Sequence, residues 1–206
     1  MSQQSYIGRC EVINVYAEKI GEVWFGVAYK GETIYGTNFG SNKENVLQGI
    51  CESISRYAFT ESPHKTEFLG QVIAALKNIY YGKEPSRSFA LSSEQLPKYA
   101  WKILQTIRKV PAGYVTSYGE VAKTAGGGPR AVGQIMARNP FAPICPCHRV
   151  VRSDFTLGGY AGGLDVKLAF LKREKRGYSY EKEIPLNGRK LKLFPVELAI
   201  RKAEEG

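Results

Sequence analysis

The residues best suited to chemistry in this chain lie between positions 144 and 152, where Pro146 is followed by Cys147 and His148. A thiol is mostly protonated near neutral pH, and its thiolate is the form that acts as a nucleophile. A neighbouring imidazole or a cationic surround raises the thiolate fraction. His148 supplies the neighbouring imidazole, and Arg149 and Arg152 supply the cationic surround. This stretch is therefore the best candidate for nucleophilic chemistry.

Adjacency alone is weak support for catalysis. Neighbouring residues of an extended strand point to opposite faces, so Cys147 and His148 cooperate only where Pro146 turns the backbone or a water bridges them. A cysteine beside a histidine is more often packing. Zinc is another alternative, because Cys145 adds a third possible ligand, but zinc sites usually space paired cysteines by two or more residues and add a second pair elsewhere. We therefore predict no metal and no cofactor.

The segment around this stretch is strongly basic. The chain carries a net charge of +10. Residues 98–152 hold nine Lys or Arg and a single acid, Glu120, whereas residues 1–97 hold nine basic and ten acidic residues. A positive field concentrated on one segment favours a polyanion as the partner over a membrane, for which a basic amphipathic helix would be expected.

Two short helices are predicted immediately before Cys147. Ser117 and Glu120 form a capping box, in which the serine hydroxyl accepts an early amide and the glutamate reaches back. Three glycines break this helix, and a second helix is predicted over residues 129–138. The outline is a helix-turn-helix. Small residues would let the backbone of the second helix approach a DNA groove or another helix closely: Ala131, Gly133 and Ala137.

Residues 157–164 form a glycine-rich segment after Cys147. It lacks the Gly-Lys-Ser/Thr ending of a P-loop, so we predict a flexible wall that presents Tyr160 rather than a phosphate site. Asp165 is predicted to cap a helix that Gly177 ends. Residues 178–206 predict a strand pair across Asn187 and Gly188 and a last short helix, without an assigned function.

The first half of the chain predicts structure without a chemical motif. Alternating apolar residues between 6 and 39, separated by turn glycines, predict a three-stranded antiparallel meander. Helices are predicted over residues 42–59, 63–81 and 93–110. The polar segment 82–88 predicts a domain junction. The predicted division is an N-terminal α/β domain of structural role (1–88), a domain with the helix-turn-helix and Cys147 (89–177), and a C-terminal extension (178–206).

Length and composition set broad limits. A chain of 206 residues, 43% of them hydrophobic, suits one large or two small globular domains. No apolar run approaches the roughly 20 residues that span a bilayer, and the polar start lacks a signal-peptide layout. We expect a soluble, intracellular monomer. It would be cytoplasmic, or nuclear if the source is a eukaryote. Four cysteines do not make a secreted disulfide framework, although a bridge between Cys10 and Cys51 stays open.

These residues together resemble the O6-alkylguanine-DNA alkyltransferase family. The resemblance rests on Pro-Cys-His-Arg-Val at 146–150, Arg-Ala-Val-Gly at 130–133, Asn-Pro at 139–140 and Tyr-x-Gly-Gly-Leu at 160–164. It covers about residues 96–177, and the pentapeptide is highly specific. The implied fold is α+β, with a ribonuclease-H-like antiparallel sheet and helices in the N-terminal half and a mainly helical C-terminal domain containing the helix-turn-helix.

The resemblance implies a suicide repair protein, which flips an O6-alkylated guanine out of duplex DNA and transfers the alkyl group irreversibly to Cys147. His148 would take the thiol proton through a water, and Glu174 would orient the histidine. Tyr160 would stabilise the departing guanine. The backbone carbonyls of Cys147 and Val150 would accept from the guanine amino group.

The same resemblance implies how DNA is bound. Arg130 would insert into the base stack in place of the flipped base, and Tyr118 would push on the phosphate. Asn139 would be the hinge between the recognition helix and the active-site loop. The recognition helix would lie in the minor groove of double-stranded DNA. Further DNA contacts would be Ser117, Ala131, Gly133 and Arg138.

Two positions depart from the family pattern, and three alternatives stay open. Ala161, in the base-binding site, stands where a serine commonly assists at the guanine oxygen, and Cys145 replaces an aliphatic residue.

A non-catalytic alkyltransferase-like binder would lack the cysteine. An alkylation-sensing helix-turn-helix regulator would need a dimerisation element, and none is evident. A cysteine hydrolase would need an orienting partner for His148 and would leave the DNA-binding features unexplained.

Overall fold

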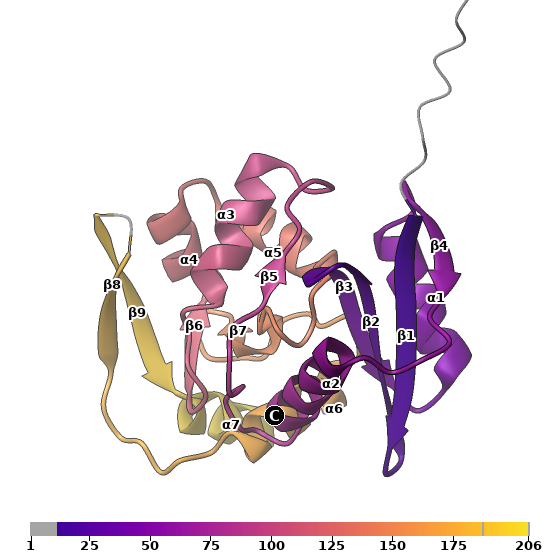
Figure 1. Ribbon diagram of the computed structural model, residues 1–206. Helices are drawn as coiled ribbons and strands as arrows, with labels where there is room; N and C mark the ends of the chain where they lie inside the picture. Colours follow the sequence, from indigo (N-terminus) through magenta and orange to yellow (C-terminus); the bar gives the residue numbers. More distant parts are fainter. Residues whose placement is uncertain (1–11, 187, 206) are drawn as a thin grey trace, which may run out of the picture.

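The computed structural model describes residues 12–186 and 188–205, which form two sheets flanked by helices (Figure 1). The strands are β1 (Val12–Ile20), β2 (Val23–Lys30), β3 (Thr33–Gly40), β4 (Ala58–Glu61), β5 (Ala90–Leu91), β6 (Tyr114–Ser117), β7 (Val150–Val151), β8 (Lys182–Leu186) and β9 (Arg189–Pro195). The helices are α1 (Lys43–Ser53), α2 (Glu67–Tyr80), α3 (Lys98–Ile107), α4 (Tyr118–Ala125), α5 (Pro129–Ala137), the 3-10 helix η1 (Cys147–Arg149), α6 (Leu164–Arg173) and α7 (Val196–Glu204). The predicted α+β class is confirmed.

The N-terminal sheet has the strand order β4-β1-β2-β3-β5. Strands β1, β2 and β3 are antiparallel neighbours, as the meander predicted, and the turns between them place Gly21 and Gly31 at φ values of 62° and 57°. The left-handed region costs glycine no steric strain, which explains this residue type at both turns. The predicted start of the meander near residue 6, and Cys10 of the possible bridge, lie outside the described residues.

The prediction of one helix over residues 42–59 is wrong in its last third. Helix α1 ends at Ser53, and Ala58–Glu61 is strand β4, which pairs in parallel with β1. The apolar residues at helical spacing continue to Ile54 and Tyr57, so the sequence pattern alone does not mark the end of the helix. The edge of β1 offers unpaired backbone groups, and pairing with them decides the conformation of residues 58–61.

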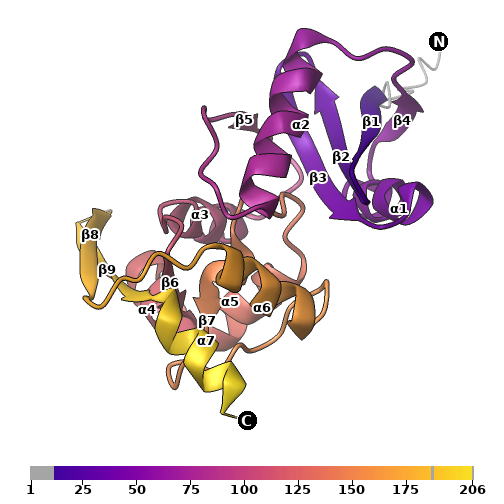
Figure 2. The same ribbon diagram turned by 90° about the horizontal axis from the view of Figure 1, so that it is seen from below.

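The N-terminal sheet is covered on both faces. Helix α1 packs on one side, where Ile13, Ala28 and Ile50 share an apolar cluster, and α2 packs on the other (Figure 2). Phe25, Val27 and Ile34 belong to the larger cluster on the α2 side. That cluster continues through α3, α4 and β9, so one core joins the N-terminal sheet to the C-terminal half.

The helix-turn-helix predicted from the sequence corresponds to α4 and α5, which pack against each other. Ser117 is the N-cap of α4, and its hydroxyl accepts the Glu120 amide at 3.1 Å. The other half of the predicted capping box is wrong, because the Glu120 carboxylate pairs with Lys123 at 2.6 Å. Strand β6, which was not predicted, precedes α4 and pairs in parallel with β7, which directly follows the 3-10 helix of Cys147.

The tail after residue 177 belongs to the second sheet, whose order is β7-β6-β9-β8. The predicted strand pair and last helix are present as β8, β9 and α7, with Asn187 outside the described residues. Helix α7 lies beside α6 (Figure 2). Two predicted boundaries of α6 are wrong: Gly163, not Asp165, is its N-cap, and Glu174, not Gly177, follows its last turn. Asp165 instead lies in the first turn, where the helix dipole favours an acid.

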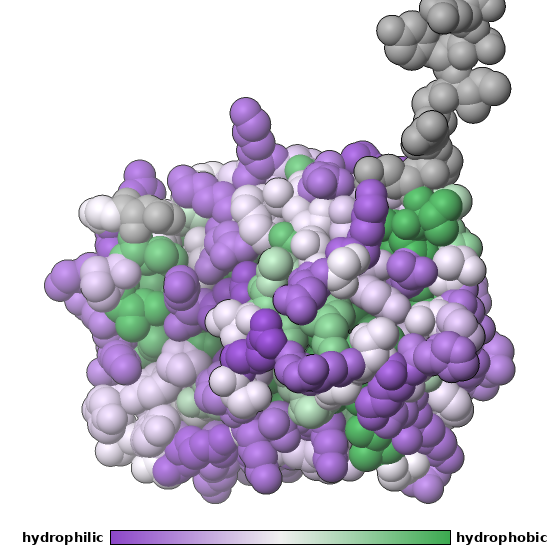
Figure 3. Space-filling model, in the orientation of Figure 1, coloured by the Kyte–Doolittle hydropathy of each residue, from purple (hydrophilic) through white to green (hydrophobic). Residues whose placement is uncertain are grey.

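The face seen in Figure 3 is mainly hydrophilic, with separate hydrophobic patches. Large apolar side chains that are exposed are scattered through the chain: Val12, Phe59, Tyr81, Leu164 and Tyr180. Within residues 12–186 and 188–205, no helix is long and apolar enough to cross a membrane.

Two glycine substitutions should change stability in opposite directions. A Cβ on Gly26 would lie 2.6 Å from Val46 Cγ1 and 2.7 Å from Ile50 Cδ1, so Gly26→Ala should cost about 1–3 kcal/mol through overpacking. Gly70 lies inside α2, and a Cβ there meets only Lys65 Cε at 3.5 Å. Gly70→Ala should therefore stabilise the protein by about 0.5–1 kcal/mol. Thermal unfolding measures both, and equal shifts for the two variants would contradict the packing described.

Candidate active site

The loop between α5 and η1 brings Cys147 to the junction of the two halves of the chain. Strand β3 holds this loop, because the Thr37 amide donates to the Pro140 carbonyl at 2.8 Å and the Thr37 hydroxyl donates to the Ala142 carbonyl at 2.9 Å. Asn139 holds it from within: its side-chain amide donates to the Cys145 carbonyl at 2.8 Å and to Cys147 Sγ at 3.2 Å. The position of the thiol thus depends on both halves.

Pro146 provides the backbone turn on which cooperation between Cys147 and His148 depends. Its φ of −79° and ψ of 69° close an inverse γ-turn, in which the Cys147 amide donates to the Cys145 carbonyl at 2.8 Å. Cys147 and His148 then lie in the 3-10 helix η1 rather than in an extended strand. The opposite-face geometry of a strand therefore does not apply to them.

Cys147 is buried, with 7% of the residue's surface exposed. Burial raises the pKa of the thiol above its ordinary value, while the hydrogen bond from Asn139 and the charge of Lys167 act to lower it. The raising effect is the larger, so the resting thiol is mostly protonated near neutral pH.

His148 is fully buried and ordered by two contacts. Its ring stacks on Phe170 with centroids 4.4 Å apart, and its Nε2 lies 2.9 Å from Glu174 Oε1. Burial lowers the pKa of His148, although Glu174 acts to raise it. A carboxylate only accepts, so Nε2 carries the proton and Nδ1 of the neutral ring is left with a lone pair. Nδ1 has no hydrogen-bond partner within the described chain.

Glu174 and Arg149 form a fully buried ion pair. Arg149 donates to the carboxylate through Nε at 2.9 Å and Nη2 at 2.8 Å, and its Nη1 donates to the Val110 carbonyl at 2.6 Å. Burial alone would raise the pKa of Glu174, but His148 and Arg149 lower it to about 2. Glu174 therefore stays charged over the whole physiological range.

Lys167 is a buried cation that the sequence analysis missed. Its ammonium donates to the carbonyls of Val150, at 2.6 Å, and Leu157, and more weakly to that of Gly159 at 3.4 Å. Burial lowers the pKa of Lys167 to about 8, and the nearby Cys147 opposes this shift. Its spacing of three and four residues from Phe170 and Leu171 places it on the apolar face of α6, and this was the signal available in the sequence.

A hollow of about 530 Å³ opens onto Cys147 between α5 and the loop that follows β7. Six residues predicted to act on DNA or on the base line it: Tyr118, Arg130, Gly133, Cys147, Tyr160 and Ala161. Burial raises the pKa of the Tyr160 hydroxyl, with smaller effects from Cys147 and Glu174, so this hydroxyl keeps its proton. The hollow thus combines a thiol, a proton donor and the exposed cation of Arg130.

The remaining predicted site residues lie around this hollow. Asn139 and Arg138 line a larger groove of about 980 Å³ that reaches β3 and also contains Cys147. Ala131 is half-buried on α5. The Ser117 hydroxyl is buried and caps α4, and the Val150 carbonyl already accepts from Lys167. His148 and Glu174 have no exposed surface and do not line the hollow.

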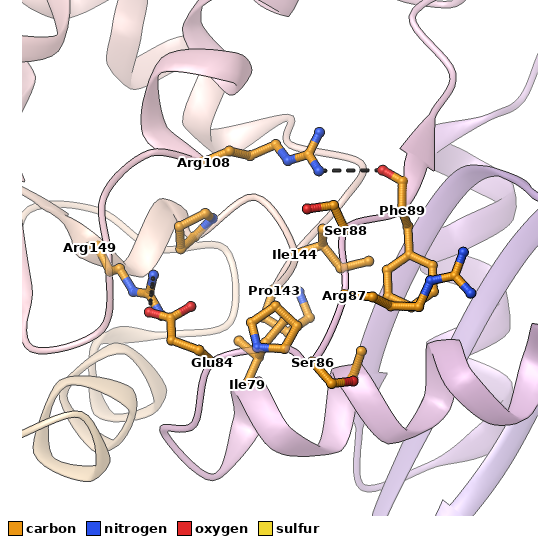
Figure 4. A pocket seen from close by; sticks show the side chains of 13 residues that line it. Ile79, Glu84, Ser86, Arg87, Ser88, Phe89, Arg108, Pro143, Ile144 and Arg149 are labelled. Atoms are coloured by element: carbon orange, nitrogen blue, oxygen red, sulfur yellow. Dashed lines mark hydrogen bonds and ion pairs between the residues drawn. The ribbon is translucent and has the colours of Figure 1, made fainter. Parts of the chain in front are cut away.

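A second cavity, of about 350 Å³, lies between α2 and the back of the active-site loop (Figure 4). At one side of it, Arg149 Nη1 lies 3.7 Å from Glu84 Oε1. At the other side, Arg108 Nη2 donates to the Phe89 carbonyl at 3.4 Å. Cys147 does not line this cavity. It is therefore separate from the hollow in which the thiol lies. No group of three metal-binding side chains occurs within the described residues.

Stability should fall as the pH is lowered from about 7 to 5. Because the pKa of His148 is lowered in the folded protein, the unfolded chain binds a proton at this imidazole in that range and the folded protein does not. The stabilisation is complete above the unfolded pKa of about 6.5 and is lost below it. Urea midpoints at the two pH values measure the change.

His64 provides the control for this prediction, because it is the only other histidine and is exposed. His64→Gln should leave the difference between the two midpoints unchanged, and His148→Gln should reduce it. An equal midpoint of the unchanged protein at pH 7 and pH 5 would show that His148 is not held neutral by the fold.

Comparisons with known proteins agree with this geometry. The family model described as "6-O-methylguanine DNA methyltransferase, DNA binding domain" matches residues 98–176. A methylated-DNA–protein-cysteine methyltransferase of Methanothermobacter thermautotrophicus is 43% identical over 126 residues, which are 61% of this chain and 70% of that relative. A methylated-DNA–protein-cysteine methyltransferase of Mycolicibacterium paratuberculosis is 38% identical over 127 residues, which are 59% of this chain and 73% of that relative.

A solved structure extends the likeness to the fold of most of the chain. The O6-methylguanine-DNA methyltransferase of the hyperthermophilic archaeon Pyrococcus kodakaraensis superposes with a TM-score of 0.64 at 28% identity, over 79% of this chain and 98% of that one. The sequence resemblance, the α+β fold and the surroundings of Cys147 therefore agree. The chain belongs to the family of methylated-DNA–protein-cysteine methyltransferases.

Proposed function

We propose that this protein repairs DNA by direct reversal of damage: it flips an O6-alkylguanine out of the duplex and transfers the alkyl group irreversibly to Cys147. The observation that carries the proposal is the arrangement at the thiol. Cys147 opens onto a hollow large enough for a base, and the next residue, His148, is buried and neutral with an unpaired Nδ1. The transfer requires a base for the thiol proton, and Nδ1 is a buried lone pair fixed in the correct tautomer.

The proposed chemistry is a single nucleophilic displacement. His148 takes the Cys147 proton through a bridging water, and the sulfur attacks the alkyl carbon as the bond from that carbon to O6 breaks. The electron pair stays on the guanine oxygen, and Tyr160 donates a hydrogen bond to the departing base. Glu174 stabilises the imidazolium that forms, because its carboxylate lies 2.9 Å from Nε2 and stays ionised.

The resting state of the proposed site keeps both partners neutral. Burial raises the pKa of the Cys147 thiol and lowers the pKa of His148, so the thiol and the imidazole are both neutral at rest, and a thiolate and an imidazolium form together when the proton moves. The product is a thioether, which a base does not reverse. We therefore propose a stoichiometric reaction with one event per molecule.

The proposed DNA contact lies on α5. Its small residues, Ala131 and Gly133, would let the helix backbone enter the minor groove, which is only about 6 Å wide. Arg130 is exposed at the start of α5 and lines the same hollow as Cys147, which suits a side chain that replaces a flipped base. Tyr118 lies across the hollow, and its hydroxyl donates to the Gly159 carbonyl at 3.4 Å. Flipping is needed because the O6 atom is unreachable inside the base stack.

The other proposed roles follow the same geometry. Asn139 would act as the hinge between α5 and the active-site loop, since its amide contacts both the Cys145 carbonyl and the thiol. The carbonyls of Cys147 and Val150 would accept from the guanine amino group, with Ala161 beside the base. Arg138, which is exposed, would complete the DNA contacts, and Ser117, whose hydroxyl is buried, would contribute by capping α4. A non-catalytic binder is less well supported, because the nucleophile is present with its base.

The direct test uses a duplex that carries one O6-methylguanine with an isotopically labelled methyl group. We expect one labelled methyl group per protein molecule, on Cys147, and no turnover when substrate is in excess. Mass spectrometry of the peptides locates the label. Cys147→Ala is the matched control and should take up no label, while Cys145→Ala should behave as the unchanged protein. Label on Cys145, or repeated turnover, would contradict the proposal.

Arg130→Ala should separate base flipping from chemistry. We expect a loss of at least about tenfold in the transfer rate from duplex DNA. A side chain that stacks between bases in place of the flipped base contributes about 1–3 kcal/mol, and Arg130→Ala removes this contact. The rate with free O6-benzylguanine should stay within about twofold, since a free base needs no flipping.

Arg56→Ala is the control for Arg130→Ala, because Arg56 is also exposed but lies in the N-terminal half. It should leave both rates unchanged. Equal losses of Arg130→Ala on duplex DNA and on the free base would exclude the wedge role.

A further inference from the structure

The loop that presents Tyr160 has little structure of its own. Residues 157–163, the glycine loop, lie between β7 and α6 outside any helix or strand, and Gly158 and Gly163 have φ values of 67° and 92°. Ordering a glycine-rich segment costs more conformational entropy than ordering other residues, so contacts from outside must hold it. Lys167 holds the carbonyls of Leu157 and Gly159 from one side.

The turn before the glycine loop is strained. Phe155 has a φ of 65°, and it is the sole non-glycine residue with positive φ in the described part of the chain. A bulky side chain in this region carries a steric cost, and the conformation persists only where the surroundings enforce it. The Phe155 amide donates to the Arg152 carbonyl at 3.0 Å. Its ring packs edge-on against Phe194 of β9, with centroids 5.2 Å apart.

The other support of the loop also comes from the C-terminal extension. Leu157 is buried in an apolar cluster to which α7 contributes Val196, Ala199 and Ile200, three of its seven buried members. The family match ends at residue 176, so Phe194 and α7 lie beyond it. A segment outside the matched region therefore packs against both Phe155 and Leu157, directly before the residues that carry Tyr160.

We propose that the C-terminal extension, through Phe194, is a positioning element for Tyr160 in alkyl transfer. The inference rests on the proposed function. With the Phe194 ring removed, the turn at Phe155 relaxes and the glycine loop shifts, so the Tyr160 hydroxyl no longer meets the guanine oxygen. The thiol is unaffected, because Cys147 is held by Asn139, whose amide donates to its sulfur at 3.2 Å, and not by the glycine loop.

The test measures single-turnover transfer from O6-benzylguanine at a temperature well below unfolding. Phe194→Ala should lower the rate constant at saturating substrate by roughly tenfold, a part of the ~100-fold that a positioned proton donor contributes. The concentration that gives half the maximal rate should change by less than about twofold. The reaction of Cys147 with iodoacetamide, which needs no proton donor, should stay at the rate of the unchanged protein.

Two further variants separate positioning from loss of structure. Leu193 is the neighbouring residue on β9, but it is buried in the main core on the opposite face of the strand. Leu193→Ala should lower the melting temperature and leave the transfer rate unchanged. Phe194→Tyr keeps the ring and should keep the rate.

A double variant tests whether Phe194 acts through Tyr160. Tyr160→Phe combined with Phe194→Ala should react no more slowly than Tyr160→Phe alone. Three outcomes would overturn the inference while the proposed function stands. The rate losses of the two single variants could multiply in the double variant, or Phe194→Ala could react as fast as the unchanged protein. Phe194→Ala could also lose as much rate with iodoacetamide as with O6-benzylguanine. Failure of the unchanged protein to react with O6-benzylguanine or with alkylated duplex DNA would overturn the proposed function itself.

Discussion

The buried carboxylate of Glu174 is the group on which the rest of the site depends. An ionised group without exposed surface must find hydrogen-bond partners in the protein, and it finds them in His148 and Arg149. These contacts tie α6 to η1, fix which nitrogen of His148 carries the proton, and direct Arg149 to the Val110 carbonyl after α3. Removing one member of such a group leaves an uncompensated buried charge, which typically costs about 3–5 kcal/mol.

The N-terminal half contains no residue proposed to react, yet it contacts the site in two ways. Thr37 forms hydrogen bonds with the active-site loop, and Phe39 packs edge-on against Phe170, the ring on which His148 stacks. Tyr80 of α2 joins the same aromatic group. The N-terminal sheet therefore supports both the active-site loop and the ring on which the imidazole stacks, within the core that joins the two halves of the chain.

The sequence predicted what is local and missed what depends on distant contacts. Cys147, His148 and the two helices before them are marked by a contiguous motif, a serine cap and glycine breaks. Glu174 was assigned only through the family resemblance, because nothing in the spacing links it to His148, 26 residues earlier. Strands β4 and β6 escaped prediction, since pairing with distant strands decides them, and Lys167 was missed because a lysine is normally solvated. The assigned roles remain predictions.

The distribution of these groups along the chain has a consequence for biosynthesis. A chain leaves the ribosome from its N-terminus, so Cys147 emerges before Lys167, Glu174 and α7 emerge. In that interval the imidazole has no carboxylate to fix its tautomer, and the glycine loop has no support from Phe194. A thiol that reacts once, as proposed, would be wasted on any stray electrophile met while the chain is incomplete. Folding ends this exposure, because burial of Cys147 raises the pKa of its thiol and keeps the thiol protonated.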